Sequence, residues 1–188
     1  KAGATTGEWG EAMRAVFGLY RAPTGISAAP SNQTEGLDQL RARVDAISDG
    51  LGRRLRLLVG KPGLDGHSNG AEQIALRAQA CGIKIDYQGI RLTPDEIATA
   101  AREGGAHIIG LSILSGSHMA LVQETMARLS QEGLASIPVV VGGIIPPDDA
   151  QKLRAMGVSR VYSPRDFQVN SIVSDILDIV EAPEMAAQ

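Results

Sequence analysis

The sequence predicts a doubly wound α/β domain in which helices cover both faces of a five-stranded parallel sheet. From residue 55 onward, short apolar runs alternate with amphipathic segments of helical period, and this alternation is typical of parallel sheets. The runs are apolar along most of their length, as strands buried on both faces are. For five such strands the common order is the flavodoxin-like 2-1-3-4-5, and ligands bind at the carboxyl ends of the strands where that order reverses.

Each expected element follows from a local pattern. The expected strands are Leu55–Gly60, Ile83–Gly89, His107–Leu114, Val139–Gly143 and Arg160–Ser163. The expected helices are Ser68–Ala80, Pro94–Glu103, His118–Gln131, Pro147–Met156 and Val169–Val180. The second of these helices has a well-defined start, because Thr93 can cap it and Pro94 suits the first helical position.

A helical extension is expected before this domain. Apolar side chains recur at helical spacing from Trp9 to Tyr20, which predicts a helix over Gly7–Tyr20 whose apolar face needs a packing partner. The stretch 26–36 is rich in Ser, Ala and Pro and is typical of a linker, and Leu37–Ile47 predicts a short helix. We therefore expect residues 1–52 to be an extension and linker, and residues 53–188 to be one domain.

Composition excludes several classes of partner. The formal net charge is −3 and no basic run occurs, which argues against binding to nucleic acid or to an anionic membrane. The single cysteine, Cys81, excludes an internal disulfide and fits a reducing cytoplasm. No apolar stretch approaches the roughly 20 residues that cross a bilayer. A cytoplasmic protein is expected, and because the chain begins with Lys1 rather than Met, it is expected to be a fragment.

The turn after the first expected strand, Lys61 to Gly70, carries a His and an Asp two residues apart. Taken alone, Asp65 and His67 fit an ordinary glycine-rich turn with a capping carboxylate. They also fit a metal-ligating imidazole that a carboxylate orients. Lys61 fits two interpretations equally well, an ion pair with Asp65 or a solvated lysine at a strand end.

Two further loops follow the third and fourth expected strands. The first contains Ser112, Leu114 and Ser115, and the second contains the pair Gly142-Gly143, where missing side chains let a bulky planar group approach the backbone. Each motif is weak by itself. All three in this order, each at the carboxyl end of its strand, form a specific combination.

On these motifs the sequence resembles the cobalamin-binding domain shared by adenosylcobalamin-dependent mutases and methionine synthase, whose signature is D-x-H-x-x-G, then S-x-L, then Gly-Gly. The resemblance implies that His67 replaces dimethylbenzimidazole as the lower cobalt ligand, with Asp65 bonded to its other ring nitrogen. It also implies a slot for the displaced nucleotide tail between the sheet and the helix that follows the first strand. The residues placed at the cofactor are Asp65, Gly66, His67, Ser68, Asn69, Gly70, Ser112, Leu114, Ser115, Gly142, Gly143, Ile144, Tyr162 and Ser163.

A closer resemblance is to the acyl-CoA mutases of the ethylmalonyl-CoA and methylmalonyl-CoA type. It covers the stretch Lys61–His67, the stretch Gly142–Pro147, and Val16–Gly25, which looks like the tail of their catalytic region. This resemblance implies adenosylcobalamin as cofactor and an isomerase that rearranges a carbon skeleton by radical chemistry. The full-length enzyme is expected to be a homodimer with a barrel that holds the acyl-CoA. Because that barrel is not in this sequence, no catalytic residue is assigned and no activity is expected from the chain alone.

Two alternatives remain open at the level of sequence. One is a corrinoid carrier for methyl transfer, although the region from Gly7 to Ile47 is short and broken for the helical cap of such carriers. The other is a cofactor-free signalling domain of the same fold. That function would give no role to His67 or to the two glycine-containing loops. Of the other histidines, His107 is expected to be structural, and His118 to face either the corrin or solvent.

Overall fold

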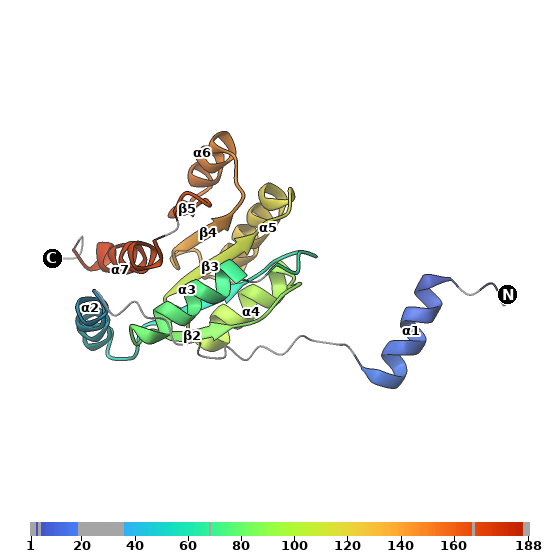
Figure 1. Cartoon of the computed structure of the whole chain (residues 1–188), viewed down its shortest axis with the longest axis horizontal. Helices are drawn as coiled ribbons and strands as arrows, with labels where there is room; N and C mark the ends of the chain where they lie inside the picture. Colours follow the sequence, from blue (N-terminus) through green and yellow to red (C-terminus); the bar gives the residue numbers. More distant parts are fainter. Residues whose placement is uncertain (1–2, 4, 19–35, 68, 167, 186–188) are drawn as a thin grey trace.

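The computed structural model describes residues 3, 5–18, 36–67, 69–166 and 168–185. Its centre is a five-stranded parallel sheet in the order β2-β1-β3-β4-β5, which confirms the predicted fold class and strand order (Figure 1). The strands are β1 Arg56–Gly60, β2 Lys84–Tyr87, β3 Ile108–Ile113, β4 Val139–Gly143 and β5 Arg160–Tyr162. The order reverses between β1 and β3, so a crevice is expected at their carboxyl ends.

Helices lie on both sides of this sheet (Figure 1). They are α1 Thr6–Phe17, α2 Leu37–Gly50, α3 Asn69–Ala80, α4 Pro94–Gly104, α5 His118–Gln131, α6 Pro147–Ala155 and α7 Val169–Met185. The start of α4 is as predicted, because Thr93 and Glu96 form a reciprocal capping box. The expected second strand ends earlier than predicted because Gly89 has φ +89, outside the extended region. None of the helices in the described ranges is long and apolar enough to cross a membrane.

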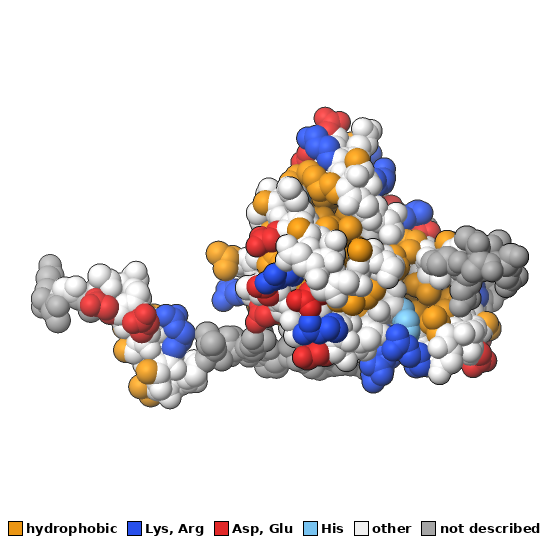
Figure 2. All heavy atoms as spheres, turned by 180° about the vertical axis from the view of Figure 1, so that it is seen from behind, with side chains coloured by type: hydrophobic (Ala, Val, Ile, Leu, Met, Phe, Trp, Pro, Cys, Tyr) orange, Lys and Arg blue, Asp and Glu red, His pale blue; other side chains and the backbone are white. Residues whose placement is uncertain are grey.

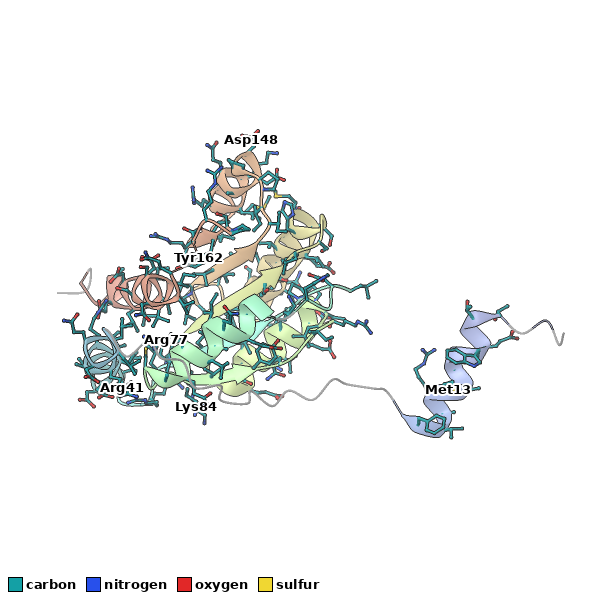
Figure 3. The ribbon with its side chains drawn as sticks, in the orientation of Figure 1. Met13, Arg41, Arg77, Lys84, Asp148 and Tyr162 are labelled. Carbon is teal, nitrogen blue, oxygen red and sulfur yellow. The ribbon has the colours of Figure 1, made fainter. Side chains whose placement is uncertain are left out.

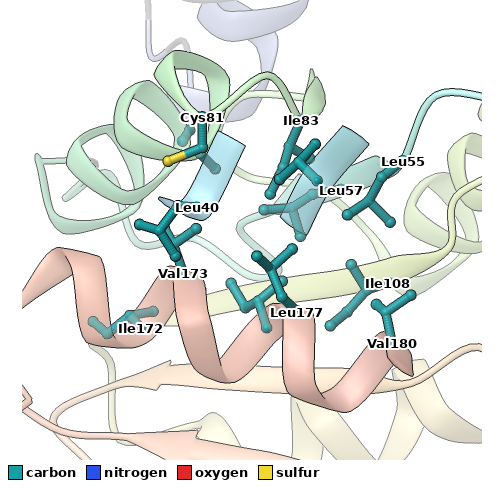
Figure 4. Close-up of a cluster of buried hydrophobic side chains, with 14 of the residues drawn as sticks. Leu40, Leu55, Leu57, Cys81, Ile83, Ile108, Ile172, Val173, Leu177 and Val180 are labelled. Atoms are coloured by element: carbon teal, nitrogen blue, oxygen red, sulfur yellow. The ribbon is translucent and has the colours of Figure 1, made fainter. Parts of the chain in front are cut away.

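Side chains alternate between the two faces of the sheet and make two apolar clusters. On one face, Leu57 and Ile108 pack against α2, α3 and α7, and Figure 4 shows the α7 residues Val173 and Leu177 in this cluster. On the other face, strand residues such as Ile109 pack against α4, α5 and α6. Full burial of one such side chain stabilises a domain by about 1.5–3 kcal/mol. Strands covered on both faces explain why the apolar runs are almost uninterrupted.

α2 packs its apolar face onto the first of these clusters. Val44 and Ile47 are buried there, and Arg43 donates to Asp178 at 2.6 Å and to Glu181 at 2.7 Å, both on α7. The sequence interpretation placed this helix in the extension, because an amphipathic pattern does not say what the apolar face contacts. The boundary between extension and domain stays a prediction, but α2 belongs to the packed core.

α1 stands apart from the sheet in Figure 1 and buries none of its residues. Thr5 and Glu8 form a capping box that starts it. The predicted apolar stripe is present and exposed: the exposed fractions of Trp9 and Phe17 are 65% and 75%, and Figure 2 shows apolar side chains on its surface. The end of the expected helix at Tyr20 and most of the expected linker lie outside the described residues.

Candidate functional site

A pocket of about 670 Å³ opens at the carboxyl ends of the strands. It lies between helices α3 and α7 and the sheet face formed by β1, β3, β4 and β5. The slot was expected beside α3, and the structure shows that α7 forms a second wall. The predicted site residues that line it are Gly66, His67, Gly70, Ser112, Leu114, Gly142, Gly143, Ile144, Tyr162 and Ser163. Three loops that are far apart in sequence are therefore brought to one cavity.

Glycines open the floor of this pocket. Gly142 lies in register with Ser112 on β3 and Tyr162 on β5, and a Cβ built on it would meet no atom within 4 Å. A side chain there would project into the pocket. Gly143 has a different role, because a Cβ on it would come within 1.8 Å of the Ile113 carbonyl oxygen. The first glycine thus gives space to the pocket, and the second allows β3 and β4 to approach each other.

Asp65 fixes the orientation of His67 at the pocket mouth. The Nδ1 atom of His67 lies 2.7 Å from Asp65 Oδ1, and the same oxygen accepts the His67 backbone N–H at 3.1 Å. An ionised carboxylate only accepts hydrogen bonds, so Nδ1 is the nitrogen that carries the proton in the neutral imidazole, and Nε2 is the nitrogen with the lone pair in that form. The His67 side chain is 83% exposed, whereas that of Asp65 is only 9% exposed. Asp65 therefore holds the imidazole through Nδ1, and Nε2 remains available to a ligand.

The Asp65 carboxylate also connects two loops. Its Oδ2 accepts the backbone N–H of Leu114 at 3.1 Å, which joins the loop after β1 to the end of β3. The pKa of Asp65 is lowered to about 2, first by the hydrogen bond from the His67 side chain and then by the His67 backbone N–H, the Leu114 N–H and the charge of Lys61. Asp65 does not line the pocket itself. It acts through His67 and the backbone.

Lys61 fits neither of the two interpretations that its sequence position suggested. The residue is fully buried, and its Nζ donates to the Ser112 carbonyl at 3.2 Å and to Ser112 Oγ at 3.0 Å. Its effect on Asp65 is electrostatic rather than a direct ion pair. Burial lowers the pKa of Lys61. Because Ser112 Oγ accepts from the lysine, the Ser112 hydroxyl proton is free to be donated toward the pocket.

The other predicted residues fall into three groups. Ser163 lines the pocket, and its backbone N–H donates to Asp166 Oδ2 at 2.7 Å, which shapes the loop after β5. Ser115 does not line the pocket, and its hydroxyl lies 2.7 Å from that of Ser117. Asn69 begins α3, but the position of its side chain is not described, and Ser68 lies outside the described residues.

The two remaining histidines are both away from the pocket. His118 does not face solvent, which corrects one of the two expectations for it: it is 5% exposed, and its Nε2 lies 3.0 Å from Asp149 Oδ2. The contact joins the first turns of α5 and α6. His107 accepts the backbone N–H of Arg56 at 3.0 Å, in keeping with the structural role expected for it.

The sequence interpretation missed the deep walls of the pocket, which come from the middle of the strands and from α7. They include Leu57, Gly110, Val140 and Ile176. Gly110 carried a usable signal, since a lone glycine inside a buried strand often marks a close approach of a ligand or a backbone. The apolar residues carried none, because an apolar side chain that lines a pocket has the same pattern as one that fills a core.

Comparison with known proteins decides the family. Residues 55–165 match the family model of the B12 binding domain. This chain belongs to the B12-binding domain family. It is 58% identical over 188 residues to ethylmalonyl-CoA mutase of Cereibacter sphaeroides, covering 100% of this chain and 29% of that protein. It is 53% identical over 182 residues to ethylmalonyl-CoA mutase of Methylorubrum extorquens, covering 96% of this chain and 26% of that protein. The chain thus spans less than a third of either curated relative.

A solved structure agrees with the family at the level of fold. A cobalamin-binding protein from Desulfitobacterium hafniense superposes with a TM-score of 0.58 at 18% identity, covering 74% of this chain and 69% of that one. At this identity the likeness concerns the fold alone.

The residues of this B12-binding domain are suited to a metal ion that is already bound in a macrocycle. No group of three or more His, Cys, Asp or Glu side chains that could hold a bare metal ion occurs in the part of the chain that the structure describes. Instead, the single imidazole of His67, oriented by Asp65, lies at the mouth of the largely apolar pocket. A corrin already supplies four nitrogen ligands, so a single neutral imidazole is a suitable addition for cobalt.

Proposed function

We propose that this B12-binding domain holds adenosylcobalamin base-off, with the nucleotide tail in the pocket and His67 as the lower cobalt ligand. The observation that carries the proposal is the Asp65-oriented imidazole at the mouth of an apolar slot. Asp65 keeps the Nδ1 proton of His67 in place and thereby presents Nε2. The buried Lys61 holds the end of β3 through two hydrogen bonds to Ser112.

The domain is further proposed to be part of an acyl-CoA mutase of the ethylmalonyl-CoA or methylmalonyl-CoA type. Its similarity to two ethylmalonyl-CoA mutases across nearly the whole chain supports this assignment. When bound, the cofactor supplies radical chemistry by homolysis of its cobalt–carbon bond. The residues of this chain bind and orient the cofactor and exclude water from its lower face. We assign the acyl-CoA substrate, the barrel that holds it, homodimer formation and a cytoplasmic location to the proposed full-length enzyme. Because the barrel is needed to hold the acyl-CoA, the domain alone is expected to be inactive.

The methyl-transfer carrier is the weaker alternative. The fold and the pocket suit both functions, because both require a corrinoid with a displaced tail. The mutase assignment is preferred because the most similar curated relatives reported above are mutases. A cofactor-free signalling domain would have no use for an oriented imidazole beside a pocket of this size.

The cobalt(II) form of the bound cofactor provides the test. In the electron paramagnetic resonance spectrum, a histidine ligand splits the cobalt lines through its ¹⁴N nucleus, and the splitting pattern changes when the protein is grown with ¹⁵N-histidine. We expect this change in the wild-type domain and in a control variant, His107→Gln, and we expect it to disappear in His67→Ala. A splitting that does not respond to ¹⁵N-histidine would show that the ligand is the cofactor's own base and would refute the proposal.

A further inference from the structure

His118 is a buried polar residue at the start of α5 that takes no part in the pocket described above. It is 5% exposed, and its Nε2 lies 3.0 Å from Asp149 Oδ2 on α6. Its Nδ1 lies 3.4 Å from the Ser115 carbonyl oxygen, too far for a strong hydrogen bond, so Asp149 is the partner that holds the ring. A buried polar pair often adds no more stability than apolar side chains of the same volume. The contact therefore points to a requirement for position.

Asp149 is an ionised acceptor for this histidine. Lys152 Nζ lies 2.9 Å from Asp149 Oδ1, which leaves Oδ2 to His118. The hydrogen bond from Lys152, and secondly that from His118, lowers the pKa of Asp149. The hydrogen bond to this carboxylate therefore requires a proton on Nε2 of His118. The preceding acid, Asp148, is exposed, and Figure 3 shows it on α6 away from the sheet.

The His118–Asp149 contact joins the first turns of two helices that lack the usual side-chain caps. Neither α5 nor α6 has a side-chain hydrogen bond at its N-cap, although such bonds commonly fix the start of a helix. α5 follows the loop that begins with Leu114, and α6 follows the loop that begins with Ile144. Both of these residues line the pocket mouth. The contact therefore fixes the two loops relative to each other from the opposite face of the sheet.

The start of α5 also supports the loop that carries His67. Leu121 lies one helical turn after His118, on the same face of α5. A Cβ built on Gly63 would come within 2.7 Å of Leu121 Cδ1, so the loop after β1 rests directly on α5. Asp65, in the same loop, accepts the backbone N–H of Leu114 from the segment that leads into α5. A displacement of α5 would therefore disturb the support of Asp65 from two sides.

We propose that His118 is a positioning residue, which through its contact with Asp149 fixes the start of α5 and thereby the direction in which Asp65 holds the His67 imidazole. Its effect on corrinoid affinity rests on the proposed function, whereas its effect on the imidazole does not require the cofactor. The control of His67 thus extends through the sheet to the helices on its other face. Loss of the contact should leave the pocket intact but allow the His67 ring to take more than one orientation.

The tautomer of His67 in the ligand-free domain is the first measurement. The protein is labelled with ¹⁵N-histidine at about pH 8, where an ordinary histidine is neutral, and two-bond ¹⁵N–¹H spectra show which ring nitrogen carries the proton. We expect the Nδ1–H form in the wild type and a mixture of both forms in His118→Phe and in Asp149→Ala, which each remove the contact. His118→Gln keeps a donor near the position of Nε2 and should restore the wild-type tautomer.

Affinity for adenosylcobalamin, measured by titration calorimetry, is the second measurement. We expect His118→Phe and Asp149→Ala each to raise the Kd about 3- to 10-fold, and the double variant to raise it no further, because both changes remove one contact. Thr125→Val is the matched control. Thr125 is also fully buried on α5, but its hydroxyl donates to the Leu121 carbonyl of the same helix at 2.7 Å. Thr125→Val and His118→Gln should leave the Kd unchanged.

Three outcomes would overturn the inference. The first is a His67 tautomer that stays unchanged in Asp149→Ala, a change at a partly exposed side chain that tests the inference even if His118→Phe does not fold. The second is a Kd that stays unchanged in both variants. The third is an equal change of tautomer in Thr125→Val, since a general loss of stability in α5 would then explain the effect. Wild-type protein that binds no corrinoid would instead refute the proposed function, and the tautomers would still decide the role of His118.

Discussion

At the scale of single residues, the carboxylate of Asp65 links the imidazole to the sheet. It accepts from the ring and the backbone of His67 on one oxygen and from the backbone of Leu114 on the other. One side chain therefore sets both the direction of the imidazole and the distance between two loops. Hydrogen bonds to a charged acceptor are stronger than neutral ones, which explains why the carboxylate remains ionised in acid.

The pH dependence of stability tests this role. The pKa of Asp65 is about 2 in the folded protein, below its ordinary value of 3.8. A lowered pKa stabilises the folded state above the unfolded value, and this contribution is lost as the pH falls through the folded value. We therefore expect the difference in unfolding free energy between wild type and Asp65→Asn to be constant from pH 7 to about 4 and to shrink toward pH 2.

Chemical denaturation at several pH values measures this difference. Asp38→Asn is the control for loss of a carboxylate, since the Asp38 side chain is 96% exposed. A difference for Asp65→Asn that does not depend on pH between 4 and 2 would contradict the proposed stabilisation of its charged form.

At the scale of secondary structure elements, the ends of β3 and β4 decide both the packing and the pocket. Gly142 and Gly143 are adjacent and chemically identical, but one borders open space and the other a backbone carbonyl. Gly143 is therefore needed for β3 and β4 to pack, whereas Gly142 is needed to keep the pocket open. The same added methyl group should have opposite effects at the two positions.

Two alanine variants make the comparison. In Gly143→Ala the methyl group would overlap the Ile113 carbonyl, and we expect a loss of stability of about 1–3 kcal/mol or more. In Gly142→Ala we expect stability to be unchanged or raised by up to about 1 kcal/mol, because the unfolded chain loses freedom. The same variant fills the pocket floor, so its affinity for adenosylcobalamin should fall about tenfold. Thermal unfolding and titration measure both effects, and equal stabilities of the two variants would contradict the assignment.

The elements also show how much the sequence can predict. Strand order and the positions of the site loops at strand ends followed from apolar runs and local motifs, whereas the Asp65–His67 contact was one of two alternatives until the resemblance to the cobalamin-binding domain favoured it. The burial of Lys61 did not, because lysines are rarely buried and only the fold brings Ser112 to its ammonium. His118 was misjudged for a similar reason, since its partner Asp149 lies 31 residues away on another helix. Pairings of this kind depend on tertiary packing and leave no local pattern.

At the scale of the whole molecule, the question is which part of the amino-terminal region belongs to the folded unit. α1 buries nothing, whereas α2 buries Leu37, Leu40, Val44 and Ile47 in the cluster beneath α7. Both helices have an apolar face in the sequence, so periodicity alone treats them alike. The structure separates them because only one has a surface to pack against among the described residues.

Two truncations test this difference. A chain that starts at residue 36 should unfold at the same temperature as the whole chain and bind adenosylcobalamin equally, because none of the residues that the structure describes before residue 36 is buried. A chain that starts at residue 53 also loses α2, whose four buried apolar side chains contribute about 1.5–3 kcal/mol each. That loss is comparable to the total stability of a typical domain, about 5–15 kcal/mol. We therefore expect the shorter chain to lack a cooperative transition in circular dichroism. If it unfolds as cooperatively and at the same temperature as the longer one, the domain begins at residue 53, as the sequence alone predicted.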